Sequence, residues 1–342
     1  AVRLDGLAAG WDGLHPHLAL SGLSMDDRKG RPALRIDRAD AVLSWWSLFA
    51  GDLRFAHVEL QGPRIALRRD AAGVIHLGDQ PLNAPAGDDD GAFAAWLLSQ
   101  PHLAVHDAIL DWRDERTGAP PLVLEGVEIA VRKAGRRHRA ALAARPPAGL
   151  AARIDLKADL QFARESGAWR SRGTVYAEGD KADLAALRAH LPLPETLRHA
   201  RGAFRVWLEV EPGAVRAVTA DIAASAVRAR LAADALPLDL ESFRGRIEYG
   251  ALPGGYRVGT RGLAFRTVSG LEAKAAEFSI ALSREEVGPP RGEVRADAID
   301  LKIAAALLDY LPVPREAKAR VLRLAPRGRI DGASLVWTGA SP

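Results

Sequence analysis

The sequence contains no cysteine, and this absence removes several kinds of site at once. A chain without thiols forms no disulfide, offers no thiolate ligand to a metal and has no cysteine nucleophile. The absence does not choose a compartment, because cytosolic and periplasmic chains can both lack cysteine.

Long hydrophobic runs are lacking as well. No segment reaches 18 consecutive apolar residues, so the sequence predicts no membrane-spanning helix. The chain opens in strand-like sequence and closes in another such run. We therefore expect it to be a piece of a longer protein whose targeting segment lies upstream.

Motifs of known catalytic sites are the third absence. The sequence has no Gly-x-Ser-x-Gly elbow, no Walker loop and no Gly-x-Gly-x-x-Gly after a strand. His102 and His106 have helical spacing, but they lie in strand-like sequence without the glutamate of a zinc protease motif. The run 88–90 of three aspartates lacks the ligand ladder of a calcium loop. We therefore predict no enzyme, no catalytic residue, no metal site and no cofactor.

The composition is that of an ordinary globular chain. Its 342 residues are 48% hydrophobic and 26% charged, which is enough to bury a core. The net charge of +4 is spread along the chain, so it does not predict a nucleic-acid partner. The one concentrated basic patch, Val131 to Ala140, is interpreted as a charged hairpin turn at Gly135. Contact with anionic lipid headgroups or with a partner is the alternative.

Two-residue alternation dominates the second half of the chain. In the run 204–210, Arg205, Trp207 and Glu209 alternate with apolar residues, and a Pro-Gly pair follows as a turn. The same pattern returns in the run 243–249, again followed by a Pro-Gly turn. We predict a mainly β fold: a long, twisted and curled antiparallel sheet of roughly a dozen or more strands, with a few short helices.

Short helices are expected at four places. Asp40 is a suitable N-cap for a helix over Ala41 to Ala50, which Gly51 would end. The other three are expected over the ranges 90–100, 181–190 and 299–310.

An internal repeat links two parts of the chain. Gly173 to Glu195 lines up with Gly292 to Arg315: each reads strand, helix, Leu-Pro-x-Pro and a second helix-like stretch before a new strand. This predicts a modular β architecture that grows by addition, with chance similarity of two apolar helices as the alternative. We predict one elongated β fragment over 1–342, with sub-units 1–82, 91–195 and 196–342.

Strands with one apolar face need cover, and the predicted helices are too few to provide it. A sheet solves this by closing, by forming a sandwich or by curling around an apolar molecule that is not protein. The last solution makes the apolar face a ligand site. Composition alone does not choose among the three.

The N-terminal sequence from Val2 to Asp79 resembles the opening of the periplasmic region of the YhdP group of AsmA-like proteins. That group shares the pattern G-x-L-x-x-x-x-V-x-L-x-x-P-x-L-x-L-x-R-D-x-x-G. The pattern is carried here by Gly51, Leu53, Val58, Leu60, Pro63, Ile65, Leu67, Arg69, Asp70 and Gly73. The resemblance continues through "WRDERTGAPPLVLEGVEI", "LPLPE" and "IDLKIAAALLDYLPVPREAKA", so it covers essentially the whole chain.

The group is similar to the repeating-β-groove, bridge-like lipid-transfer proteins, and the resemblance implies a function. It implies a taco-shaped sheet in the periplasm of a Gram-negative cell, with an anchor in the inner membrane upstream of residue 1. The apolar concave face would conduct phospholipid between the inner and outer membranes, in outer membrane biogenesis. The implied partners are phospholipid, the inner membrane and other envelope proteins, with no nucleic acid.

Strand parity gives candidate residues for the groove. The predicted lipid-binding residues are Leu110, Trp112, Leu122, Leu124, Phe204, Val206, Leu208, Phe243, Ile247, Phe265, Phe278 and Ile280, and the residues predicted to be solvated on the opposite face include Arg205, Glu209, Arg244, Arg246 and Glu248. A register error of one residue would invert a whole strand. Trp45, Trp46 and Phe49 are predicted to cap the membrane-proximal end, with a helix packed under the sheet edge as the alternative.

Two other classes of function stay open at this point. One is a structural or assembly scaffold of the periplasm, whose apolar faces are buried on each other and which has no lipid conduit. The other is an enzyme of carbohydrate or lipid metabolism whose site the sequence does not reveal. A groove should copurify with phospholipid, whereas a sandwich should not.

Overall fold

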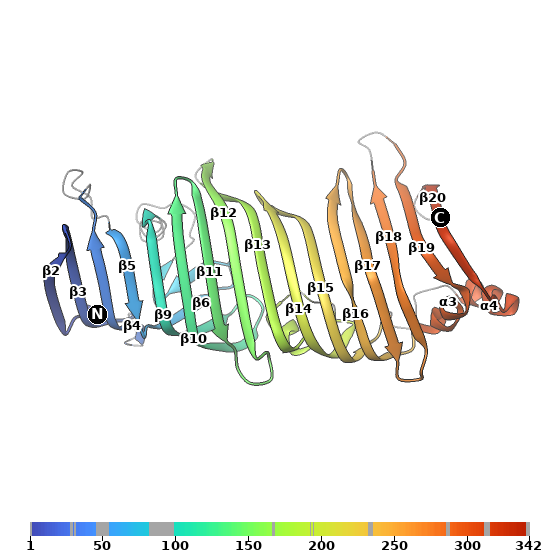
Figure 1. Ribbon diagram of the computed structural model, residues 1–342, viewed down its shortest axis with the longest axis horizontal. Coiled ribbons are helices and arrows are strands. Elements are labelled where there is room, and N and C mark those ends of the chain that lie inside the picture. Colours follow the sequence, from blue (N-terminus) through green and yellow to red (C-terminus); the bar gives the residue numbers. More distant parts are fainter. Residues whose placement is uncertain are drawn as a thin grey trace. The chain divides into compact units, whose positions relative to one another are not determined.

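The computed structural model describes residues 2–27, 30, 32–45, 55–81, 99–165, 168–191, 193, 195–231, 235–284, 288–310 and 315–339. The chain is mainly β, and its strands belong to one mixed sheet (Figure 1). It divides into two compact units, which are described separately. Unit 1 is Ala1–Ala177 with Glu211–Gly213, and unit 2 is Glu178–Val210 with Ala214–Pro342. The predicted mainly β fold with a few short helices is confirmed.

Unit 1 contains the first twelve strands and part of β13. They are β1 (Val2–Arg3), β2 (Gly6–Asp12), β3 (His15–Asp26), β4 (Pro32–Leu43), β5 (Phe55–Gln61), β6 (Arg64–Arg69), β7 (Ile75–Leu77), β8 (Gln80–Pro81), β9 (His102–Asp114), β10 (Ala119–Ala134), β11 (Arg137–Arg145), β12 (Arg153–Glu165) and β13 (Ala168–Asp183). Neighbouring strands in the described part of unit 1 pair antiparallel, except that β9 runs parallel to both β5 and β6. The sequence did not predict these parallel pairs, because a strand reached through a long connection carries no hairpin signal.

Unit 2 contains the remaining strands and the described helices. They are β14 (Leu197–Glu211), β15 (Ala214–Ala229), β16 (Leu238–Leu252), β17 (Gly255–Thr267), β18 (Glu272–Ser283), β19 (Arg291–Asp300), β20 (Arg329–Thr338), η1 (Ala186–Ala189), α3 (Leu301–Leu307), η2 (Leu308–Tyr310) and α4 (Arg315–Leu324). From β15 to β20 each strand pairs antiparallel with the next. Within the described residues, no helix is long and apolar enough to span a membrane.

The predicted helix over 41–50 is wrong at its start. Ala41, Val42 and Leu43 are the last residues of β4. Ala41 and Val42 pair with β3 on one side and with β5 on the other, and Leu43 pairs with Phe55 of β5, so the sheet satisfies their backbones before a helix can begin. Tertiary pairing therefore overrides the helical spacing of the apolar residues. Residues 46–50 of this prediction lie outside the described residues.

The other three helix predictions have different outcomes. The helix predicted over 299–310 is present from Leu301 as α3 and η2, after β19 ends at Asp300. The one predicted over 181–190 starts later, because β13 runs to Asp183 before η1 forms. The one predicted over 90–100 lies almost entirely outside the described residues.

In both repeat copies an aspartate at the end of a strand accepts hydrogen bonds from the backbone that follows it. The carboxylate of Asp183 accepts hydrogen bonds from the backbone nitrogens of Ala185 and Ala186. Asp300 accepts from Lys302 and Ile303 at 2.9 and 3.1 Å and is the N-cap of α3. The second helix-like stretch forms only in the later copy, as α4, since β14 already begins at Leu197 in the earlier one.

The Arg-Asp-x-x-Gly part of the family pattern has a structural role. Arg69 reaches the carboxylate of Asp114 with two nitrogens, and its Nε donates at 2.9 Å. Asp114 also accepts from the hydroxyl of Thr117 at 2.8 Å. These donors, the Arg69 side chain first, hold the pKa of Asp114 well below its usual value. Asp70, the next residue, accepts from the backbone of Val74 and so closes the turn after β6.

This arrangement predicts a pH-dependent loss of stability. We expect Asp114→Asn to lower the thermal midpoint at pH 7, because an amide cannot replace a carboxylate that accepts from Arg69. A lowered folded-state pKa stabilises above the unfolded pKa of about 3.9, and the stabilisation is lost as the pH falls toward the folded value. The difference in thermal midpoint between the wild type and Asp114→Asn should therefore become smaller below about pH 4.

Thermal melts of both proteins between pH 7 and pH 3 measure this difference. Asp331→Asn is the control, since Asp331 pairs with Arg329 on the surface and its side chain is well exposed. That variant should change the midpoint little. A difference for Asp114→Asn that stays constant over the whole pH range would contradict the assignment.

Candidate functional site

A row of apolar residues crosses eight strands of unit 1. Directly paired residues of neighbouring strands lie on the same face of a sheet, so the register identifies the row. It consists of Leu7, Leu20, Ala39, Leu60, Val105, Ile129, Leu142 and Leu156. No polar side chain interrupts it. We call the side of the sheet that carries this row the apolar face of unit 1.

Part of this face is a closed core. Val127 is fully buried, and Val105, Ala108 and Ala144 are buried with it. Of the predicted groove residues, Leu110 and Leu124 are partly buried against this cluster and lie opposite each other in the register. Trp112 and Leu122 form the next pair along. The four candidates in unit 1 therefore share one face, and two of them pack against a closed core.

Two apolar rows cross the sheet of unit 2 from β15 to β20. The first row is Val218, Tyr249, Val258, Ile280, Val294 and Leu335, and the second is Ala220, Ile247, Thr260, Phe278, Ala296 and Ala333. The polar groups in the rows are the hydroxyls of Tyr249 and Thr260, and the Thr260 hydroxyl accepts a hydrogen bond from the backbone N–H of Phe278 at 3.2 Å. These rows define the apolar face of unit 2. Phe278 and Ile280 remain 38% and 37% exposed, so the face is open to solvent there.

The predicted groove residues of unit 2 fall on this face. Phe243 lies opposite Phe265, and Ile247, Phe278 and Ile280 belong to the two rows. The guanidinium of Arg246, on the charged side of β16, lies 5.7 Å from the ring centre of Trp207 on β14, which puts Trp207 on the face opposite the apolar rows. The alternate residues of β14 therefore belong to the apolar side, and they are Phe204, Val206 and Leu208.

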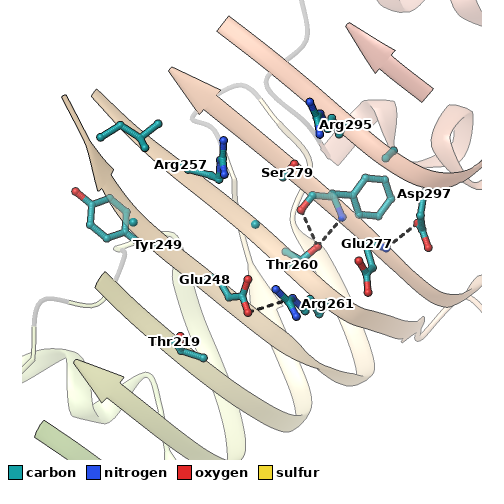
Figure 2. A pocket seen from close by; sticks show the side chains of 15 residues that line it. Thr219, Glu248, Tyr249, Arg257, Thr260, Arg261, Glu277, Ser279, Arg295 and Asp297 are labelled. Atoms are coloured by element: carbon teal, nitrogen blue, oxygen red, sulfur yellow. Dashed lines mark hydrogen bonds and ion pairs between the residues drawn. The ribbon is translucent and has the colours of Figure 1, made fainter. Parts of the chain in front are cut away.

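The opposite face of unit 2 is charged and largely self-paired. A recess of about 550 Å³ lies on the charged side, and Figure 2 shows Glu248, Arg261 and Arg295 among the residues that line it. Arg261 pairs with Glu248 at 3.2 Å, and Arg295 pairs with Glu293 at 2.6 Å. Such pairing is typical of a solvated sheet surface and leaves little charge for a ligand. Arg205, Glu209 and Arg244, predicted to be solvated, are exposed.

The membrane-proximal cap is described only in part. Trp45 is 40% exposed, and its ring centre lies 6.3 Å from that of Trp11. Trp46 and Phe49 lie outside the described residues, so the cap stays a prediction. Sequence reasoning missed Trp11, which is 69% exposed on β2. The pairing of β2 with β3 and of β3 with β4 brings Trp11 near Trp45. No local sequence motif predicts a contact between residues so far apart in the chain.

The other polar candidates have ordinary structural partners. His106 lies 2.8 Å from the carboxylate of Glu128, and the residues in the described ranges contain no cluster of three or more potential metal ligands. Gly135 lies in the turn between β10 and β11, with φ +62°, and Arg137 pairs with Asp159 beside it. The basic patch therefore includes the predicted hairpin turn. The three aspartates of the run 88–90 lie outside the described residues.

This arrangement suits a hydrocarbon ligand more than a reaction. Apolar rows that cross strands offer contact along the sheet, and removing apolar area from water yields about 25 cal/mol per Å². A row of similar side chains contains no single deep minimum, so a bound chain can shift from one position to the next. Charged groups gather on the other face, where water solvates them.

Comparison with known proteins adds one match. No curated protein and no solved structure matches the chain significantly. The family model described as YhdP protein matches residues 1–341. Because this match spans nearly the entire chain, the protein belongs to the YhdP family.

Proposed function

We propose that the protein transports phospholipid between the inner and outer membranes of a Gram-negative envelope, along its apolar faces. The YhdP family is an envelope family of AsmA-like proteins associated with lipid transport. The observation that carries the proposal is the open apolar face of unit 2, where two rows cross six strands and large side chains stay exposed to solvent. A soluble protein rarely leaves such a continuous surface without a ligand.

The physical reason lies in how a lipid would be shielded. Acyl chains that lie on the apolar rows leave water, while the headgroup can stay in it. Moving one residue along the row exchanges similar contacts, so the barrier between positions is small. We further propose that the protein works in the periplasm, attached to the inner membrane through a segment outside this sequence.

Lipid extraction gives the direct test. We expect mass spectrometry of an organic extract of the purified protein to find phospholipid, at about one molecule or more per chain when the face offers several equivalent positions. The control is the same extraction from the Ile247→Asp variant. A wild-type protein that is folded and free of phospholipid would favour a scaffold whose apolar faces serve assembly.

A further inference from the structure

Helical connections cover the apolar face of unit 2 in two places, and the first fits tightly. η1 follows β13, and its Leu187 is only 5% exposed. The neighbouring Leu184 packs against a cluster that includes Ala200, Val227 and Leu240. The side chains of this connection therefore pack against the sheet as closely as those of an ordinary protein core.

The second connection fits loosely. α3 follows β19 and has no buried residue, although Ile303 and Leu307 are large and apolar. Between α3 and strands β17 to β19 lies a cavity of about 650 Å³. Its lining is mostly apolar with charged residues among it, and its volume lies within the range of roughly 300–1,000 Å³ that small-molecule pockets have.

The lining of this cavity defines the chemistry of its ligand. The sheet contributes Leu263, Phe265, Phe278 and Ala298, and the helix contributes Ile303 and Leu307. Lys274 also lines the space and forms no ion pair with any residue in the described part of the chain. The other charged residues of the lining already have partners: Arg329 pairs with Asp331 at 2.6 Å, Glu272 pairs with Arg266 at 3.3 Å, and Asp300 is the N-cap of α3.

From these observations we propose that the cavity under α3 is a holding site for one acyl chain of an anionic phospholipid. The chain lies between the helix and the sheet, and Lys274 is available to the phosphate. The inference rests on the proposed function and deepens it. The open rows let a lipid move, whereas the covered cavity is a place where it stops. Phe278 belongs to both the open row and the cavity, so a lipid can pass from one to the other.

The absence of cysteine makes a site-specific test practical, because one introduced thiol is the only one in the chain. Ala304 lines the cavity, whereas Ala306 lies on the same helix, exposed and outside the lining. We would measure the rate at which N-ethylmaleimide alkylates Ala304→Cys and Ala306→Cys, with and without phosphatidylglycerol. At a lipid concentration about tenfold above its dissociation constant, Ala304→Cys should react about tenfold more slowly and Ala306→Cys at an unchanged rate.

Several outcomes would overturn the holding site. One is equal alkylation of Ala304→Cys with and without lipid, and another is protection by oleate but not by phosphatidylglycerol, which would indicate a free fatty acid. Slow alkylation without any lipid would show that α3 closes on an empty space. If the melting temperature of Ala304→Cys falls, Ala276→Cys replaces it, since Ala276 lines the same cavity.

A third thiol separates this inference from the proposed function. Ala220 lies on the open row, opposite Ile247. If lipid protects Ala220→Cys and leaves Ala304→Cys reactive, the holding site is wrong and the transport proposal stands. If lipid protects neither position and none copurifies, both proposals are wrong.

Discussion

Replacing Ile247 by aspartate should remove lipid from the apolar face of unit 2 while the protein stays folded. Ile247 lies between Ala220 and Thr260 in its row, and these small neighbours leave it only partly buried. A carboxylate there still reaches water, so we expect a folding cost of about 1–2 kcal/mol, the lost burial of one aliphatic side chain. Against an acyl chain the same charge costs about 2.5–3.5 kcal/mol, which lowers occupancy by more than tenfold.

The measurement compares copurified lipid with thermal stability in each variant. Leu208→Asp, on β14, should behave like Ile247→Asp. Ser279→Asp is the matched control, because Ser279 lies between two apolar-face residues of β18 but points to the charged face opposite Arg295. It should retain wild-type lipid. If Ile247→Asp unfolds the protein, or if it keeps its lipid, the open-face interpretation is wrong.

Strand parity was readable from the sequence wherever a strand is regular. In β16, Phe243 and Ile247 share a face, and the arginines between them lie on the other, as alternation predicts. The fold class follows from the same signal, because hairpin turns at Pro-Gly pairs separate the alternating runs. Gly254 shows why such turns need glycine: its φ is +63°, and an added Cβ would lie 2.1 Å from the backbone oxygen of Arg284.

Irregular positions were not readable. β-bulges interrupt the register between Leu124 and Val127 of β10 and between Arg261 and Ala264 of β17, and each inserts a residue that alternation cannot count. Asp107 and Ala226 adopt positive φ although neither is glycine, so their residue types did not predict this backbone conformation. The parallel pairing of β9 and the continuation of β4 through Leu43 depend on contacts between distant segments, which local pattern does not contain.

Closed and open regions of the apolar faces also look alike in sequence. Val127 in unit 1 and Ile280 in unit 2 both stand in alternating strands, yet the first is fully buried and the second is 37% exposed. What covers a residue is decided by segments that are far away in the chain. The sequence therefore predicts which face is apolar, whereas only the structure indicates where that face is accessible.

Replacing Val127 by aspartate should therefore have the opposite consequence to Ile247→Asp and unfold the structure around it. Val127 has no solvent contact and packs with Val105, Ala108 and Ala144, so a carboxylate there would be buried without a partner. We expect a loss of about 4 kcal/mol or more, a large share of the roughly 5–15 kcal/mol that stabilises a domain. Val123→Asp is the control, since this valine of β10 is exposed and should cost little. Chemical denaturation of both variants measures the difference. Equal stability of the two would show that the cluster around Val127 is as open as unit 2, and lipid would then have access to the whole apolar face of unit 1.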